Sequence, residues 1–136
     1  MLIKSAASIP TRRVNAEWFT GTVWQDPVAE PPAPTRAKSA LVSFEPGART
    51  NWHHHPLGQS LYVVSGTGRA QVWGQSVIQL NPGDRVWIPP GEKHWHGASP
   101  ENGMVHLAIH ESDATGNHVT WLERVTDEQY AQKPGV

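Results

Sequence analysis

The chain has 136 residues, a length that suits a single domain. Eleven lysines and arginines nearly balance twelve aspartates and glutamates, which argues against nucleic acid or an anionic membrane surface as a partner. The absence of cysteine excludes disulfides, thiolate metal sites and cysteine nucleophiles. The N-terminal residues lack the apolar core of a signal peptide, and no stretch has the length and apolarity of a membrane span, so we expect a cytoplasmic protein.

The first part of the chain predicts one strand between an arm and a loop. Residues 1–17 are weakly patterned and are expected to form an N-terminal arm, either disordered or paired with the sheet edge of a partner subunit. Residues 18–24 combine aromatic and β-branched side chains around Gly21 and predict a strand. Residues 26–38 carry four prolines and predict a surface loop, because proline cannot donate a hydrogen bond to a strand ladder.

Short β-prone runs separated by turn residues fill the middle of the chain. The expected strands are 39–44, 59–65, 69–73, 76–80, 85–88, 104–111 and 117–124. Thr126, with Gln129 three residues later, fits a capping box and predicts a short helix over 126–133. The sequence therefore predicts one all-β domain over 1–136, a jelly-roll β-barrel with its core at 37–125 and a short C-terminal helix.

A cluster of nitrogen and oxygen donors lies between two of these strands. His53 and His55 are two residues apart, so both side chains face the same side of an extended strand. Gln59 follows beyond a Pro-Leu-Gly turn, and His94 adds an imidazole from a second segment, 83–96. Neutral imidazoles and an amide oxygen predict a divalent-metal site at these four residues.

The spacing of these residues resembles the two-part motif of the cupin superfamily. The motif positions are Gly47, His53, His55, Gln59 and Gly66 in the first part and Gly83, Pro89, Gly91 and His94 in the second. Two positions depart from the family pattern, with glutamine at 59 in place of the usual glutamate and alanine at 98 in place of asparagine. The segments WFTGTV, FEPGART, HPLGQ, PGEKHWHGA, HLAI and VTDEQY further resemble small cupins that include the bacterial metal-dependent hydroxynitrile lyases.

The glutamine at position 59 changes the charge of the predicted site. Three imidazoles and an amide are all neutral, so a bound divalent ion keeps its full charge and is a stronger electrophile than in a site with a carboxylate. Mixed nitrogen and oxygen donors suit Mn, Fe, Co, Ni or Zn. The resemblance to the lyases implies manganese as the first candidate.

Four other histidines receive different interpretations. Residues 104–111 alternate, which places His106 and His110 on one face; that face is either solvated or lines the metal pocket. The resemblance favours the pocket, where His106 corresponds to a base, while His110 replaces a glutamine of the lyases. His54 points away from the two ligands that flank it. His118 is interpreted as a surface residue.

The resemblance implies four further pocket positions. Thr50 and His96 match further pocket positions of the lyases, although Thr50 is otherwise an ordinary turn residue. Ala40 and Val42 would line the cavity and set its width, and they equally form an apolar core stripe.

We therefore expect a metal-dependent enzyme that cleaves or forms cyanohydrins, with His106 as base and Thr50, His96 and His110 orienting a small-molecule substrate. The same metal ligands would also serve a cupin dioxygenase or isomerase. A non-catalytic cupin that binds a small ligand or a metal is the alternative from another class. The resemblance also implies a homodimer or homotetramer.

Overall fold

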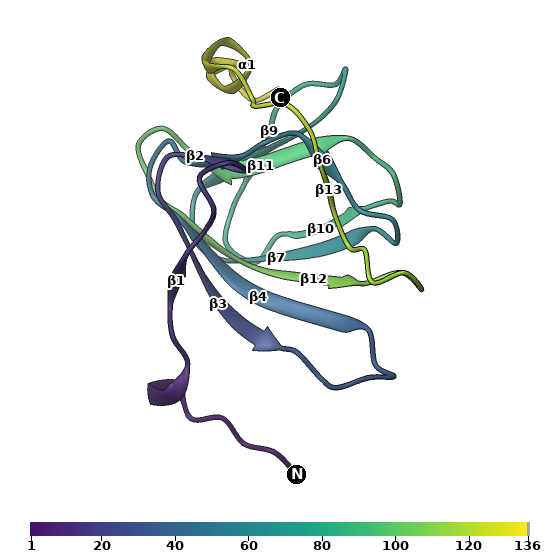
Figure 1. Cartoon of the computed structure of the whole chain (residues 1–136). Helices are drawn as coiled ribbons and strands as arrows, with labels where there is room; N and C mark the ends of the chain where they lie inside the picture. Colours follow the sequence, from purple (N-terminus) through teal and green to yellow (C-terminus); the bar gives the residue numbers. More distant parts are fainter. Residues whose placement is uncertain (136) are drawn as a thin grey trace.

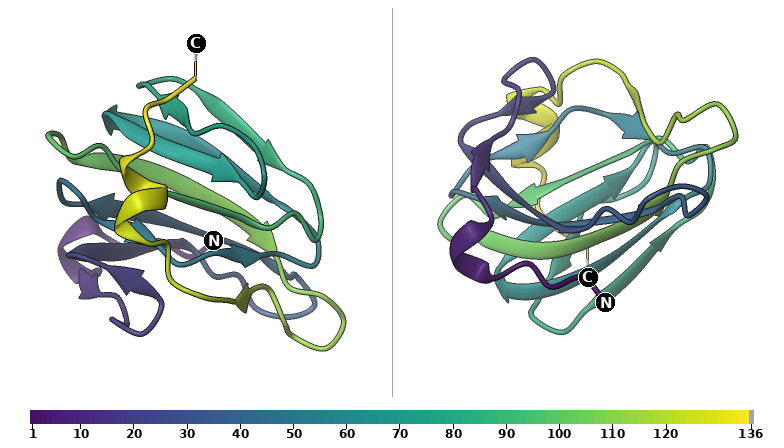
Figure 2. Two further views of the ribbon diagram at one scale, coloured as in Figure 1. Left: turned by 90° about the horizontal axis from the view of Figure 1, so that it is seen from above. Right: turned by 60° about the horizontal axis from the view of Figure 1, so that its bottom comes forward.

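Two antiparallel β-sheets face each other in the computed structural model, which describes residues 1–135 (Figure 1). The strands of the larger layer are, in spatial order, β1 (Arg12–Arg13), β3 (Val23–Ala29), β4 (Ala37–Phe44), β12 (Met104–Glu111), β7 (Gln59–Gly66) and β10 (Arg85–Ile88). The strands of the second layer are β13 (Thr120–Trp121), β6 (His53–His54), β11 (His94–Ala98), β5 (Arg49–Thr50) and β2 (Phe19–Thr20), with β8 (Gly68–Val72) on β11 and β9 (Ile78–Leu80) on β8. Figure 2 shows the two layers from two further directions.

The layers do not close into a barrel within residues 1–135. Several strands of the second layer, among them β5, β6 and β13, have only two residues, and such short ladders cannot join the two sheets into a continuous cylinder. The prediction of an all-β, cupin-type jelly-roll fold with a short C-terminal helix is confirmed, and its two sheets are not closed into a cylinder within residues 1–135. The fold is a jelly-roll sandwich.

Strands β4 and β12 show how the sequence determines the core. Alternate residues of β4, namely Ala40, Val42 and Phe44, are buried between the layers, as a period of two requires. Strand β12 pairs with β4 on one side and β7 on the other, and its residues His106 and Ala108 point inward as well. The interior face of this sheet therefore brings polar imidazoles into an otherwise apolar core.

The C-terminal helix α1 (Asp127–Ala131) lies on the outer side of the second layer (Figures 1 and 2). Both bonds of the predicted capping box are present, between Thr126 and Gln129. Tyr130 anchors the helix by donating its hydroxyl hydrogen to the Ala98 carbonyl at 2.6 Å, and it packs in a second apolar cluster with Trp52 and Trp95. The predicted helix is confirmed, with its observed end two residues earlier.

The N-terminal region differs from the prediction in two places. The expected strand at 18–24 is interrupted at Gly21, whose φ of +80° favours glycine and whose missing Cβ would lie 2.9 Å from Ala48 Cα. Strand β3 continues through Pro27 to Ala29, so the predicted loop begins later. Proline is tolerated there because β1 pairs only with Trp24 and Gln25, which leaves the rest of that side of β3 as a free edge.

Near the C-terminus, only Thr120–Trp121 of the expected strand at 117–124 forms a strand, β13. The predicted arm forms the short 3₁₀ helix η1 (Ala6–Ser8) and strand β1, which pairs with β3 of the same chain. None of the residues 1–135 belongs to a helix long and apolar enough to cross a membrane.

Candidate metal centre

Three buried histidines share one pattern of hydrogen bonding. The Nδ1–H groups of His53, His55 and His94 donate to main-chain carbonyls, those of Asn51 at 2.9 Å, His118 at 2.7 Å and Glu92 at 2.8 Å respectively. A histidine that donates from Nδ1 keeps its lone pair on Nε2, which is the tautomer that a metal ligand needs. We call these three the carbonyl-held histidines.

The carbonyl-held histidines form one cluster. Their ring centroids are separated by 4.2 Å for His53–His94, 5.0 Å for His53–His55 and 5.5 Å for His55–His94. Nε2 of His55, Nε2 of His94 and Oε1 of Gln59 are buried and have no hydrogen-bond partner within residues 1–135. Buried acceptors without a donor are costly, and a cation would satisfy them. The donor set therefore fits a divalent metal.

Local geometry explains how Gln59 joins this cluster. Gly58 precedes it with a φ of +78° and closes the turn by donating its N–H to the His55 carbonyl at 3.3 Å. A Cβ at Gly58 would lie 2.6 Å from the Ile88 carbonyl oxygen, so the turn requires glycine. Gln59 then opens β7 with its side chain pointing inward.

Burial keeps the cluster neutral. Desolvation, followed by the proximity of His94 and His55, lowers the pKa of His53 well below its ordinary value. Burial also lowers the pKa of His55, and it lowers that of His94 to about 4. Neutral imidazoles are the form that binds metals, so these shifts favour ligation at neutral pH.

A second grouping of histidines competes with the predicted one. Ligand atoms of His53, His94 and His96 lie within 4.8 Å of one another, so His96 is a candidate ligand that the motif does not assign. His96 Nδ1 lies 3.1 Å from Nε2 of His106, and one proton must lie between these two nitrogens.

The position of that proton separates the two groupings. If His106 donates, its Nδ1 keeps a lone pair and His96 Nε2 carries a hydrogen, so His96 cannot ligate through Nε2. If His96 donates, its Nε2 is free for a metal and His106 Nδ1 is a donor. Both outer nitrogens, His96 Nε2 and His106 Nδ1, are buried without a partner among residues 1–135.

The carbonyl-held cluster opens on a cavity of about 100 Å³ between the two layers. Its predicted lining residues are Ala40, Val42, Thr50, His53, His55, Gln59, His96, His106 and His110. Of the predicted site residues, His94 is the exception, since it lies beside His53 but not on the cavity wall. His54 is half-buried and does not line the cavity, in agreement with its predicted orientation. The structure thus brings the predicted residues to one place, while their roles remain predictions.

His118 departs from the prediction of a surface position. It is half-buried and lines the cavity, and its ring stacks on that of His110 at 4.7 Å with an interplanar angle of 13°. Its carbonyl also accepts the Nδ1–H of His55. No local pattern indicates these contacts, because His55 and His118 are 63 residues apart and one partner is a main-chain atom.

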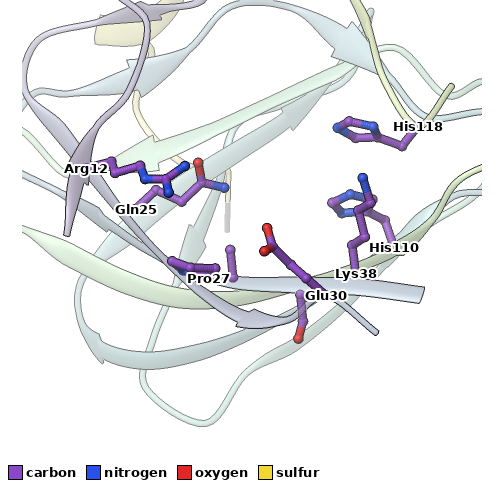
Figure 3. A pocket seen from close by; sticks show the side chains of 9 residues that line it. Arg12, Gln25, Pro27, Glu30, Lys38, His110 and His118 are labelled. Atoms are coloured by element: carbon purple, nitrogen blue, oxygen red, sulfur yellow. The ribbon is translucent and has the colours of Figure 1, made fainter. Parts of the chain in front are cut away.

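A second pocket of about 180 Å³ adjoins the cavity and shares Gln25, Ala40, His110 and His118 with it. Figure 3 shows the stacked His110 and His118 rings on one side of this pocket and Arg12 with Gln25 on the other. The two spaces therefore meet at the four shared side chains.

An aromatic wall of the cavity, which the sequence did not predict, is formed by Phe19, Phe44 and Trp121. Two of these residues come from short strands at opposite ends of the chain, β2 and β13. Their proximity follows from pairing with β5 and β6, which no short-range pattern in the sequence reveals.

Comparison with protein families matches residues 40–110 to the family described as Cupin domain. The chain is also 54% identical over 130 residues to the (R)-mandelonitrile lyase of Granulicella tundricola, which covers 96% of this chain and 98% of that protein.

Solved structures show the same fold. A cupin-like protein from Thermotoga maritima matches with a TM-score of 0.81 and 40% identity, covering 87% of this chain and 89% of that one. The polyketide cyclase RemF from Streptomyces resistomycificus matches with a TM-score of 0.75 over 96% of this chain and 90% of that one. Its identity is 17%, so this likeness concerns the fold alone.

Proposed function

The chain belongs to the cupin family, as its two-part motif predicted, and we propose that it is a metal-dependent hydroxynitrile lyase that cleaves and forms cyanohydrins. The observation that carries the proposal is His106. This buried imidazole lines the cavity, and its Nδ1 has no hydrogen-bond partner within residues 1–135. The 54% identity to a mandelonitrile lyase narrows the chemistry that such a base would perform.

The carbonyl-held histidines and Gln59 are the proposed metal ligands. The second grouping, with His96, fits less well because His96 Nδ1 faces another imidazole rather than a carbonyl, so nothing fixes its tautomer for ligation. Manganese is the first candidate, and the donor set also suits Fe, Co, Ni or Zn. A divalent ion held there supplies a Lewis acid for the cyanohydrin oxygen or for cyanide.

His106 is the proposed base. Burial lowers its pKa to about 4, so it is neutral at physiological pH and its Nδ1 accepts the hydroxyl proton of a cyanohydrin. As the oxygen becomes a carbonyl, the bond to the nitrile carbon breaks and its electron pair leaves with cyanide. The imidazolium returns its proton to cyanide, which gives an aldehyde and hydrogen cyanide.

The apolar surroundings of His106 disfavour its protonated form but still allow a reversible proton transfer from the substrate. Phe44 packs against His106 with 5.3 Å between ring centroids, and this burial disfavours an isolated imidazolium. Cyanide forms in the same cavity at the same moment, and an opposite charge nearby favours the charged form. Protonation of His106 is therefore coupled to carbon–carbon cleavage.

Three other cavity residues orient the substrate in this proposal. Thr50 Oγ1 accepts the backbone N–H of His96 at 3.2 Å, which leaves its own hydrogen for a substrate oxygen. His96 Nδ1 accepts the Nε2–H of His106 in this proposal, which leaves the lone pair of His106 on Nδ1. Both ring nitrogens of His110 are buried without a partner within residues 1–135, so either is available to the substrate.

We also propose that the chain works as a homodimer or homotetramer. Exposed apolar side chains on the larger sheet support this proposal, including Tyr62 of β7, Trp87 of β10 and Ile109 of β12, three neighbouring strands. Light scattering of the purified protein tests it, and a monomer at micromolar concentration would contradict it.

The test of the proposed function combines metal analysis with catalysis. The purified protein is loaded with manganese, dialysed and analysed for metal, and mandelonitrile cleavage is followed by benzaldehyde release before and after chelation. The proposal predicts bound metal and cleavage that chelation abolishes and manganese restores. Bound metal with no cleavage, together with oxygen uptake, would favour a dioxygenase instead. Tight ligand binding without any turnover would favour a non-catalytic cupin.

A further inference from the structure

The second pocket, which meets the cavity at four shared side chains, has two basic residues in its lining, Arg12 and Lys38. We propose that it is a carboxylate subsite, which holds an anionic group at one end of a ligand whose other end lies in the cavity. This inference rests on the proposed lyase function for the reacting end. It names the substrate class as cyanohydrins that carry a carboxylate.

Strand register places Lys38 on the inner face of the larger sheet. Lys38 of β4 is directly opposite His110 of β12, and His110 is directly opposite Gln59 of β7. Directly opposed residues of antiparallel strands lie on the same face of the sheet. A row of side chains therefore runs from Lys38 to a proposed metal ligand over two strand spacings, about 10 Å.

A second row leads from Arg12 to the proposed base. Arg12 of β1 is directly opposite Gln25 of β3. Val42 of β4 is directly opposite Gln25 on one side and His106 on the other. This row covers three strand spacings, about 14 Å. Each cation therefore lies at the outer end of a row whose inner end is the proposed reaction centre, and an elongated ligand would lie along these rows.

Neither cation is neutralised by a neighbouring carboxylate. The ion pairs formed within residues 1–135 include neither Arg12 nor Lys38. Figure 3 shows Arg12 on one side of the second pocket and Lys38 beside the His110 and His118 rings on the other. A guanidinium binds a carboxylate through two parallel hydrogen bonds, and an ammonium adds a point charge. An anion in this pocket would therefore be attracted from both sides.

His110 supplies a neutral hydrogen-bond donor where the two spaces meet. Both of its ring nitrogens are buried without a partner within residues 1–135. Burial, followed by the proximity of His118, lowers the pKa of His110 to about 4, so the ring has one N–H and no charge at neutral pH. A carboxylate oxygen that accepts this N–H would remove the cost of leaving it unpaired.

The charges of the pocket indicate a monoanion. Glu30 lines the same pocket and is not ion-paired with either cation within residues 1–135. Two cations and one carboxylate leave a net charge of +1, which complements a carboxylate better than a phosphate dianion. Both cations precede residues 40–110, the range that matches the Cupin domain, so the match to that family does not assign them a role.

The first experiment measures binding to the metal-free chain, in which no ion competes for the anion. Propionate and its neutral analogue propionamide are titrated and followed by NMR. We expect propionate to bind about tenfold more tightly than propionamide, and Arg12→Gln and Lys38→Gln each to weaken propionate binding about tenfold. Arg13→Gln and Lys133→Gln are the matched controls and should leave it unchanged. Arg13 faces the opposite side of β1, and Lys133 does not line the pocket. Glu30→Gln should tighten propionate binding, because it removes a like charge.

Catalysis by the metal-loaded chain separates this inference from the lyase proposal. The value of kcat/KM is measured for the cyanohydrin of succinic semialdehyde and for that of butanal, which has the same chain length and no charge. The wild type should favour the carboxylate about tenfold, and Arg12→Gln and Lys38→Gln should lose this preference. If no cyanohydrin is turned over but the propionate pattern holds, the lyase proposal fails and the carboxylate subsite stands. Equal rates on the two cyanohydrins, propionate binding that ignores both cations, or tighter binding of inorganic phosphate than of propionate would overturn the subsite.

Discussion

Two groups of histidines lie at or beside one cavity and differ in the partners of their ring nitrogens. The carbonyl-held histidines donate Nδ1–H to main-chain oxygens, which have no hydrogen to return. The cavity histidines, His96, His106, His110 and His118, contact one another instead, through one hydrogen bond and one stacked pair.

This difference teaches how one residue type performs two functions in the same fold. A main-chain carbonyl fixes the tautomer of its partner and commits the opposite nitrogen to a metal. An imidazole paired with another imidazole has two tautomers of similar energy, so its proton can move. In the proposed mechanism, the backbone thus selects the metal ligands, and the pair of imidazoles keeps a base available.

The largest effect is expected from His106→Ala, which removes the base and leaves the carbonyl-held group intact. Mandelonitrile cleavage should fall by about 10²–10⁴-fold, the usual contribution of a general base. Metal content, measured by elemental analysis, should not change. His54→Ala is the matched control, because His54 is adjacent to two ligands but does not line the cavity. A His106→Ala variant with wild-type turnover would remove the base from the mechanism.

A second prediction concerns the acid stability of the metal-free protein. The pKa of His106 is about 4 in the folded chain, against an ordinary 6.5. Below pH 6.5 His106 binds a proton in the unfolded chain but stays neutral in the folded chain. The free energy of unfolding therefore falls as the pH drops from 6.5 towards 4. The loss from this residue is about 3 kcal/mol and is absent above pH 6.5.

Urea unfolding at pH 7.5 and pH 4.5 measures this loss. In His106→Leu the decrease between the two pH values should be smaller than in the wild type by about that amount, since leucine does not titrate. An identical decrease in both proteins would show that His106 is not buried in its neutral form.

Gln59→Glu should have an intermediate effect, because it adds a carboxylate to a neutral donor set. Metal affinity should rise while kcat falls on the order of tenfold, or ~1.4 kcal/mol in the barrier, since the ion becomes a weaker electrophile. Gln25→Glu places the same charge elsewhere on the cavity wall and is the control. Competitive chelation and cleavage rates measure the two quantities, and weaker metal binding in Gln59→Glu would argue against a ligand at this position.

The smallest effect is expected from His118→Ala. His118 supports His55 through its main-chain carbonyl, which alanine retains, so metal content should be unchanged. Loss of the stacked ring on His110 should lower kcat/KM by about threefold, in line with the energy of one aromatic contact. Loss of metal in this variant would mean that the ring, rather than the carbonyl, holds His55.

Residues that act at fixed local spacing could be predicted from the sequence. The turn at Gly58 brought Gln59 to the cavity as expected, and the capping box of Thr126 marked the helix. The alternation of β12 placed His106 and His110 on one face as expected, while the resemblance to a family was needed to assign that face to the cavity. In each case the relevant period or turn lies within a few residues of the chain, where backbone geometry alone determines direction.

Contacts across the fold could not be predicted in the same way. Trp121 reaches the cavity because β13 pairs with β6, and His118 reaches it through a main-chain bond and a stacked ring. Pro27 likewise belongs to a strand because β1 is too short to pair with that part of β3. These outcomes depend on the ends of strands and on free edges, which are set by tertiary packing rather than by propensity.

The central claim is that the carbonyl-held histidines bind the metal and that His96 does not. Manganese titrations of His55→Ala and His96→Ala, measured side by side, test it most directly. We predict that His55→Ala loses manganese affinity by at least about 100-fold, whereas His96→Ala stays within about tenfold of the wild type, as expected for a residue outside the coordination sphere. Retention of metal by His55→Ala and its loss from His96→Ala would contradict the account and place the ion among His53, His94 and His96.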